Sequence, residues 1–450
     1  MQTSHPSSSS SFNPPTRLTK TLLAFSLYTN FRSWLNTSPA PGALEAVHGI
    51  RFLTMCWVLL GHYMVFQFKN CLNQKDMYED VLQLWSYDFI NNAVFSCDTF
   101  LAMSGLLTAY VTVIGMEKRK SWRINWADFY FHRFWRLTPP YMAVILLAQG
   151  LIRFCGKGPL WPTSDPAYTR YCGDRWWTNL LYVNNFLGMG QQCFGHGWYL
   201  AVDMQLYVLS PLLLVSLYKH RSLGLALCAA CLLASWTYNG VTSTMNGWVP
   251  GSVNNIHGDL NDKHFYWEHY YSKPWCRCGP FVVGVLAGFA LAKHRGRLEL
   301  SRTANTLGWA LSAFVFLSAV YGIRGDVSGN SPSSVGVAAL YNASARTAWG
   351  AAVCWVVVSC ALGWGGAVNS FLSWPPFVCL GRLTYMVYLI HPSLNLVYLQ
   401  SRDALVYYDR LSMAVSYVGV LVLVNMVAFV LMLALESPMR GLEKAITVTR

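Results

Sequence analysis

The fold of this protein is decided by residues 48–67, which read HGIRFLTMCWVLLGHYMVFQ. The stretch is long and apolar enough to cross a bilayer as one helix, because about 20 such residues span the hydrocarbon core. It nevertheless contains Arg51 and His62. An ionisable side chain at bilayer depth costs about 2.5–3.5 kcal/mol on insertion scales. The sequence therefore predicts a membrane-spanning helix that keeps these two side chains for a function.

Arg51 and His62 fall on one face of this helix. Eleven residues separate them, which at about 100° per residue is about 20° more than three full turns. Along the helix axis they lie about 16 Å apart. A stripe that carries a cation near one membrane surface and an imidazole beyond the midplane cannot face lipid, so we expect it to face the protein interior.

The composition indicates a polytopic membrane protein. Of the 450 residues, 54% are apolar and only 12% are charged, whereas soluble domains carry about 25% charged residues. Recurring apolar runs predict about ten spans. These lie roughly over 48–68, 89–114, 137–154, 197–218, 222–238, 277–292, 305–323, 346–366, 377–400 and 411–435. We expect an all-α, multi-pass protein of the plasma membrane or the endoplasmic reticulum.

The basic residues report the orientation of the spans. The formal net charge is +13, but the basic residues lie between spans and form no separate basic domain, which argues against a nucleic-acid partner. Lys118, Arg119, Lys120 and Arg123 gather in the loop after the second span. The positive-inside rule then places this loop and both chain termini in the cytosol.

The connections on the other side carry features of an oxidising compartment. Asn342-Ala-Ser is a glycosylation sequon in a loop expected outside, so the sequence predicts a glycoprotein modified at Asn342. Cys172 and Cys193 bracket another outside loop and are the preferred disulfide pair. No cluster with the spacing of metal ligands is found, and no metal site is predicted.

Further ionisable residues interrupt the predicted spans. Asp98, Asp203 and His391 lie within the second, fourth and ninth spans, and Arg277 caps the sixth. Counting from the span boundaries places both aspartates and both intramembrane histidines in the outer half of the bilayer. We therefore expect one shared cavity.

The chemistry that fits these residues is general-base catalysis. An imidazole can take a proton from an acceptor hydroxyl or amine as it attacks an activated carbonyl. A carboxylate on the other ring nitrogen would fix the tautomer, and Asp98 and Asp203 are both candidates. No GxSxG elbow is present, which favours direct transfer over a covalent intermediate. A proton or substrate transporter would carry the same residue types.

Residues 122–137, WRINWADFYFHRFWRL, mix aromatic and basic side chains. Such a segment is typical of an interfacial helix, with its aromatic side chains in the membrane and its cations toward lipid phosphates. Alternatively, Arg133 and Arg136, at helical spacing, form an anion site for the phosphates of an acyl donor. The residues alone leave both interpretations open.

Ordered blocks along the chain resemble those of the membrane acyltransferase 3 family, and specifically its animal nose-resistant-to-fluoxetine branch. The blocks include HGIRFLTMCWVLLGHY (48–63), CDTFLAMSGLLT (97–108), HRFWRLTPPYM (132–142), GWYLAVDMQLYVLSPL (197–212) and LTYMVYLIHPS (383–393). Each block is weak alone, but the ordered set is specific and spans about 45 to 445. The resemblance implies a ten-helix membrane core that moves an acyl group, commonly acetyl, from cytosolic acyl-CoA to an acceptor.

The resemblance also implies roles for single residues. It maps the family's first-span arginine and histidine onto Arg51 and His62, with the histidine as catalytic base. It maps the paired arginines on the donor side onto Arg133 and Arg136. It maps the family's fourth-span pattern onto Trp198, Asp203 and Tyr207. We expect these residues, with Arg277 and His391, to line the cavity. Bacterial relatives typically have Glu in place of Asp203, a change that keeps the charge.

Animal members of the family usually carry a cysteine-bearing extracellular domain and an extra span before this core. Here a Ser-rich segment precedes it, and we expect residues 1–44 to be a disordered cytosolic linker, 45–445 the acyltransferase domain and 446–450 a cytosolic tail. Expected partners are acyl-CoA as co-substrate, with no bound cofactor, and a lipid, glycan or small-molecule acceptor. The alternatives are a lipid or drug transporter and a non-catalytic descendant of the family.

Overall fold

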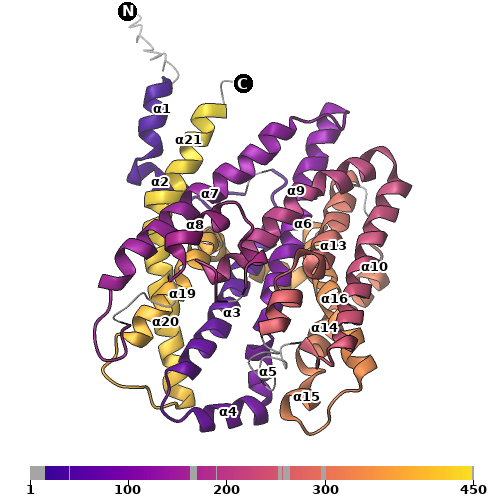
Figure 1. Ribbon diagram of the computed structural model, residues 1–450. Coiled ribbons are helices and arrows are strands. Elements are labelled where there is room, and N and C mark those ends of the chain that lie inside the picture. Colours follow the sequence, from indigo (N-terminus) through magenta and orange to yellow (C-terminus); the bar gives the residue numbers. More distant parts are fainter. Residues whose placement is uncertain are drawn as a thin grey trace, which may run out of the picture.

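The computed structural model is built from helices (Figure 1). It describes residues 16–447 apart from residues 40, 163–169, 189, 252–255, 257–263 and 295–299. Among these residues no β-strand forms, and one parallel bridge between Cys71 and Val406 is the extent of strand pairing. The expectation of an all-α fold is confirmed.

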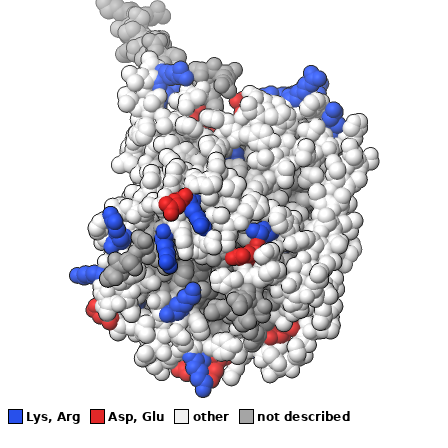
Figure 2. All heavy atoms as spheres, in the orientation of Figure 1, with Lys and Arg blue, Asp and Glu red and all other residues white. Residues whose placement is uncertain are grey.

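Nine helical stretches of the described chain are long and apolar enough to span a membrane. Their main helices are α3 (Ala46–Lys69), α6 (Phe95–Arg119), α7 (Trp126–Leu151), α9 (Trp198–Lys219), α10 (Arg221–Met245), α13 (Pro274–Lys293), α14 (Arg302–Tyr321), α16 (Val335–Ala361) and α20 (Arg410–Leu431). On the face seen in Figure 2, the right-hand flank is almost free of charged side chains, as a surface facing lipid should be.

The tenth expected span, 377–400, is divided into α18 (Pro375–Gly381) and α19 (Thr384–Gln400). With 17 residues, α19 alone is at the short end of the range of about 17–25 for a transmembrane helix. Arg382, in the break, donates hydrogen bonds to the carbonyl oxygens of Ser33 and Trp34 at 3.0 and 2.7 Å. The break therefore binds the N-terminal segment.

Shorter helices occupy the two ends of the molecule (Figure 1). At one end α1 (Arg17–Ala24) and α2 (Leu27–Leu35) lie near α21 (Ser437–Thr447), and both termini are on this side. At the opposite end lie α4 (Gln74–Gln83), α5 (Trp85–Asn91) and α15 (Arg324–Ser328). We call these the cytosolic end and the outer end, following the charge-based prediction.

Part of the N-terminal segment that we expect to be disordered is helical, because α1 and α2 pack near α21 and the break before α19. Residues 1–15 of that segment and residues 448–450 of the expected tail lie outside the described residues. The remaining short elements are α8 (Cys172–Leu180), α17 (Gly366–Leu372), the 3₁₀ turns η1 (Asn92–Val94), η2 (Ile152–Phe154), η3 (Asn184–Phe186) and η4 (Gly195–Gly197), and the π-helical turns η6 (Trp267–Tyr271) and η7 (Met432–Glu436).

The helices α6 and α13 cross with their backbones in close contact. Gly105 of α6 faces the carbonyl of Phe281, and Gly284 of α13 faces the carbonyl of Ala102. A Cβ atom at either glycine would overlap the facing carbonyl oxygen. Small residues permit this close approach between helices in a membrane. The contact sets the distance between Asp98 on α6 and Arg277 on α13.

The helices α3 and α19 run parallel to each other. At the cytosolic end Gly381, just before α19, packs on His48. Halfway along, His391 meets His62, and beyond both helices Val406 pairs with Cys71. Because these contacts follow the same order on both segments, the two helices cross the molecule in the same direction and present their histidines at the same depth.

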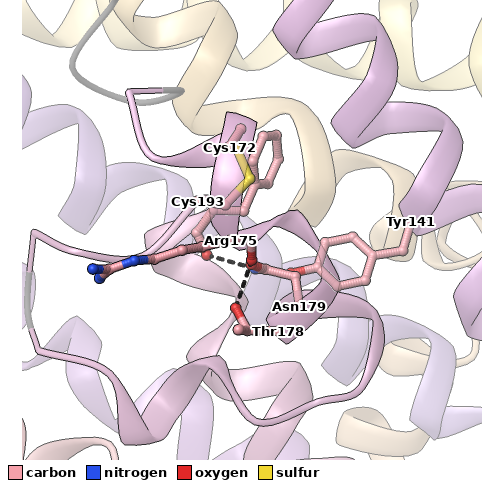
Figure 3. The surroundings of a disulfide bond; sticks show 7 residues. Tyr141, Cys172, Arg175, Thr178, Asn179 and Cys193 are labelled. Atoms are coloured by element: carbon pink, nitrogen blue, oxygen red, sulfur yellow. Dashed lines mark hydrogen bonds between the residues drawn. A yellow bond between two sulfur atoms is a disulfide. The ribbon is translucent and has the colours of Figure 1, made fainter.

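A disulfide joins Cys172, at the start of α8, to Cys193 (Figure 3), which is the pair preferred from the sequence. The bond ties α8 to the loop that leads into η4. Next to it, Asn179 donates hydrogen bonds to the hydroxyl of Tyr141 at 2.7 Å and to the carbonyl of Phe194 at 3.2 Å. The loop before α9 is therefore held on both α8 and α7.

The glycosylation expected at Asn342 does not fit the structure. Asn342 lies inside α16, which begins about a dozen residues before the predicted span, and only 3% of Asn342 is exposed. Its amide nitrogen donates to Ser243 Oγ and to the carbonyl of Val249, and its oxygen accepts from the N–H of Gly251. A glycan would replace one of the two N–H donors of this amide and would need space around a nitrogen whose residue is 3% exposed, so the prediction is corrected.

At the outer end, Asp80 of α4 binds Arg410, the first residue of α20. The carboxylate accepts hydrogen bonds from Arg410 at 2.6 and 2.7 Å and from the hydroxyl of Tyr408 at 2.6 Å. The bonds from Arg410, together with that from Tyr408, hold the pKa of Asp80 below its usual value although burial opposes them. Ionised Asp80 therefore stabilises the fold above a pH of about 3.9, the usual pKa of Asp.

We expect Asp80→Asn to lower the melting temperature at pH 7 by a few degrees. Since the contribution of a carboxylate with a depressed pKa is lost as the pH falls from its unfolded pKa through its folded pKa, the difference from the wild type should begin to narrow below a pH of about 4. Thermal unfolding of the detergent-solubilised proteins between pH 7 and pH 3 measures this difference. A gap that is equally wide at both ends would contradict the assignment.

Candidate active site

A cavity of about 730 Å³ lies at the cytosolic end between α3, α6, α7, α9 and α19. In its wall, six arginines outnumber three carboxylates. The arginines are Arg51, Arg119, Arg133, Arg136, Arg382 and Arg440, and the carboxylates are Asp128, Asp203 and Glu436. We call it the arginine cavity. Its excess of positive charge favours an anionic ligand.

The helix α7 carries two of these arginines inward. Arg133 and Arg136 face the cavity, while Phe131 and Phe134 are 38% and 48% exposed on the helix surface. The 122–137 segment thus places Phe131 and Phe134 on the helix surface and Phe129 and the two arginines in the cavity wall, and the anion-site interpretation of Arg133 and Arg136 stays a prediction.

Arg133 already has a carboxylate partner. It forms an ion pair with Asp203 of α9 and a hydrogen bond with Ser104 Oγ at 3.3 Å. Its guanidinium lies over the ring of Tyr207, 4.6 Å from the centroid, and Tyr207 stacks on Phe129. Asp203 and Tyr207 therefore fix one arginine in the cavity wall.

Arg51 and Arg136 differ from Arg133. Neither side chain makes a hydrogen bond or an ion pair within 4 Å with another residue that the structure describes, although both line the cavity and Glu436 lies in the same wall. A partly desolvated cation without a partner is unfavourable. Two such cations in one cavity, beside the paired Arg133, are the arrangement expected for binding a ligand with several negative charges.

Three histidines lie behind the wall of the arginine cavity. Tyr388 of α19 lines the cavity, and its ring centroid lies 6.0 Å from that of His391 and 5.3 Å from that of His196. Nε2 of His391 lies 3.4 Å from Nδ1 of His62, and the centroids of His391 and His196 are 5.7 Å apart. We call His62, His196 and His391 the histidine cluster.

His196 is the member that sequence reasoning missed. It lies in the turn η4, outside any predicted span interior, and so gave no signal of intramembrane cost. The available hint was its position directly before the block 197–212 and two residues before Trp198. The Cys172–Cys193 disulfide holds the loop that brings it to His391.

Asp98 and Arg277 form a separate, fully buried ion pair. Arg277 is 0% exposed, and its NH1 lies 2.9 and 2.8 Å from the two oxygens of Asp98. Nε of Arg277 donates to the carbonyl of Tyr271 at 2.9 Å. The guanidinium also lies 4.2 Å from the ring centroid of Tyr271 and 5.3 Å from that of Trp198. The pair joins α6 to α13 and η6.

The ionisable groups therefore occupy three places rather than one shared cavity. Asp203 lies in the arginine cavity, Asp98 is bound to Arg277, and His62 and His391 meet in the histidine cluster. In the described chain neither aspartate hydrogen-bonds to His62. Depth along a helix is readable from sequence, but the partner across the interface is not. The structure thus assigns neither carboxylate as the orienter of His62.

Across the residues that the structure describes, no group of three His, Cys, Asp or Glu side chains is arranged to hold a metal ion.

Residues 44–434 match the acyltransferase 3 family, which is described as an acyltransferase domain. The chain belongs to the acyltransferase 3 family. The match covers nearly all of the helices that form the arginine cavity and the histidine cluster. The acyltransferase 3 assignment made from the ordered sequence blocks is confirmed.

Two curated relatives come from Caenorhabditis elegans. The chain is 31% identical to the nose resistant to fluoxetine protein 6 over 468 aligned residues, covering 97% of this chain and 55% of that protein. It is 25% identical to the regulator of hypoxia-inducible factor 1 over 312 residues, covering 62% of this chain and 57% of that protein. The chain thus spans little more than half the length of either relative. No solved structure matches it significantly.

Proposed function

We propose that this protein is an integral-membrane acyltransferase that moves an acyl group such as acetyl from cytosolic acyl-CoA to a hydroxyl or amine acceptor. The acceptor would be a lipid, a glycan or a small molecule at the membrane or on its outer side. The observation that carries the proposal is the arginine cavity, with unpartnered Arg51 and Arg136, backed by the histidine cluster. The plasma membrane and the endoplasmic reticulum both fit such a protein.

The arginine cavity is suited to the phosphates of coenzyme A. Arg51, Arg133 and Arg136 would bind them, because guanidinium groups pair with phosphate oxygens in a bidentate way. The ligand's narrow arm would then pass Tyr199 and Tyr388 toward the histidines that Tyr388 contacts. In this arrangement the charged part of the donor stays at the cytosolic end while its thioester reaches the middle of the molecule.

His62 would act as the general base. It takes the proton from the acceptor O–H or N–H as that atom attacks the thioester carbonyl carbon. The new C–O or C–N bond forms, the C–S bond breaks, and the thiolate of coenzyme A receives the proton back from His62. Atoms and charge balance without a covalent enzyme intermediate or any further co-reactant.

The test of donor binding compares Arg51 variants in nanodiscs. We expect Arg51→Met to weaken acetyl-CoA binding by about tenfold or more, since a charge-assisted hydrogen bond contributes roughly 1.5–3 kcal/mol. Arg51→Lys should recover only part of the loss, because an ammonium cannot bind phosphate in a bidentate way. The matched control is Arg221→Met, at an exposed position at the start of α10 outside the cavity.

Labelled acetyl-CoA in an equilibrium binding assay gives the affinity, and release of free coenzyme A gives turnover. Equal weakening by Arg51→Met and Arg221→Met would mean that only net charge matters and would remove Arg51 from the site. A folded wild-type protein that binds no acetyl-CoA would overturn the donor assignment. That result would favour the transport alternative.

A further inference from the structure

His391 is followed by Pro392 inside α19, and this pair leaves one backbone carbonyl open. In a regular helix the N–H of residue 392 would bond to the carbonyl of Tyr388, but proline has no N–H. Nδ1 of the His391 ring takes the vacant place, 2.8 Å from that oxygen, and lies 3.2 Å from the carbonyl of Val387. A carbonyl oxygen only accepts, so Nδ1 of neutral His391 carries the proton and Nε2 the lone pair.

The lone pair of His391 faces His62. Nε2 of His391 lies 3.4 Å from Nδ1 of His62, and the same Nδ1 lies 3.0 Å from the carbonyl oxygen of Val58. Both neighbours of this nitrogen are acceptors. Neutral His62 therefore holds its proton on Nδ1 and keeps its lone pair on Nε2.

We propose that His391 is a positioning residue that holds His62 in the tautomer with a basic Nε2, taking the place that a carboxylate has in a Ser-His-Asp triad. The inference rests on the proposed function, in which Nε2 of His62 removes the acceptor proton. While His62 is an imidazolium, its Nδ1–H continues to donate a hydrogen bond to Nε2 of His391. The proton on Nε2 of His62 is the one that goes to the departing thiolate. A neutral acceptor suits this depth, because a buried carboxylate is costly to desolvate.

Among the described side chains around His62, His391 is the one placed to accept a hydrogen bond from its Nδ1–H. It is 0% exposed, and the titratable groups that act on it are His62 from α3 and His196 from η4. The helices α7 and α20 also pack against α19, but neither presents a charged side chain to His391 in the described chain. Asp98 and Asp203 are bound to Arg277 and Arg133 instead.

The experiment compares three variants around this contact. His391→Leu removes the acceptor, His391→Gln keeps a side-chain oxygen that can accept from His62, and Pro392→Ala restores an N–H that competes for the Tyr388 carbonyl. We expect His391→Leu to lower kcat on the order of 10²-fold, less than the roughly 10⁴-fold loss known for a triad with the wrong tautomer. His391→Gln and Pro392→Ala should lose less. His220→Leu, at an exposed position between α9 and α10, is the matched control.

Two readouts separate positioning from a general structural effect. First, KM for acetyl-CoA should stay unchanged in all variants, while the acid limb of the pH–rate profile should move to lower pH in His391→Leu, because the imidazolium of His62 loses its acceptor. Second, ¹⁵N NMR of histidine-labelled protein in nanodiscs should show a protonated Nδ1 and a bare Nε2 for His62 in the wild type. In His391→Leu a measurable fraction of the tautomer protonated on Nε2 should appear beside the form that the Val58 carbonyl still favours.

The outcomes distinguish this inference from the proposed function. A wild type that shows the expected tautomer but no turnover would overturn the acyltransferase proposal and leave the positioning contact standing. A wild type that turns over while His391→Leu keeps its rate, pH profile and His62 tautomer would overturn the role of His391. If His391→Leu fails to fold, the comparison of Pro392→Ala with wild type decides by the same two readouts.

Discussion

His62→Gln is expected to lower the rate of acyl transfer by about 10²–10⁴-fold, the usual contribution of a general base. The amide of Gln can still donate to the carbonyl of Val58 and lie against His391, but it cannot take a proton at the position of Nε2. Acetyl-CoA binding should be unchanged, because His62 is not among the residues that line the arginine cavity that would hold the phosphates. Release of coenzyme A from labelled donor, with the protein in nanodiscs, measures the loss.

His220→Gln is the control for this variant, since it makes the same substitution at an exposed histidine outside the histidine cluster and the arginine cavity. Surface expression and size-exclusion behaviour should match the wild type in both proteins. Full activity in His62→Gln would remove the imidazole from the mechanism. Loss of acetyl-CoA binding together with activity would mean instead that His62 supports the cavity rather than the chemical step.

Asp98→Ala is expected to be the most destabilising substitution in the membrane core. It leaves Arg277, which is 0% exposed, without its carboxylate. Removing one partner of a buried ion pair typically costs about 3–5 kcal/mol, because the remaining charge is buried and uncompensated. The pair also joins α6 to α13 and, through the carbonyl of Tyr271, to η6. The temperature at which half the protein loses its monodisperse peak after heating in detergent should fall by many degrees.

A double-mutant cycle tests the cause of this effect. Asp98→Leu combined with Arg277→Met removes both charges and should be less harmful than the sum of the two single changes. The exposed pair Lys293–Glu117, with both side chains 42% exposed, is the matched control, for which about 0–1 kcal/mol is expected. Additive effects at Asp98 and Arg277 would contradict the coupling that their geometry implies.

The sequence predicted the features that depend on the periodicity and hydropathy of a single helix. The period of α3 put Arg51 and His62 on an interior face, and the structure places Arg51 in the arginine cavity and His62 in a part-buried contact with His391. The spacing of Arg133 and Arg136 likewise predicted two cations on one side of α7. Hydropathy and helical periodicity are properties of a local segment, so they can be read without a partner.

Features that depend on a second segment could not be read in this way. From the sequence, Asp98 and Asp203 were equivalent candidates as partners for His62. In the structure, however, the crossing of α6 and α13 pairs Asp98 with Arg277, and Asp203 forms an ion pair with Arg133 of α7. Asn342 appeared to be in a loop because the start of α16 is less apolar than its middle. Its burial depends on contacts with Ser243 and Val249 from another part of the chain.

The arginine cavity depends on residues outside the family match, because Arg382 is held by residues before position 44 and Arg440 lies after position 434. Arg382 lines the arginine cavity and is held by the carbonyls of Ser33 and Trp34, which precede the matched residues 44–434. Glu436 and Arg440, in the same cavity wall, follow them. A gene fragment trimmed to the family match would express a cavity with part of its wall missing and one of its arginines unsupported. The smallest expressible unit that keeps the cavity whole therefore extends at least from Ser33 to Arg440.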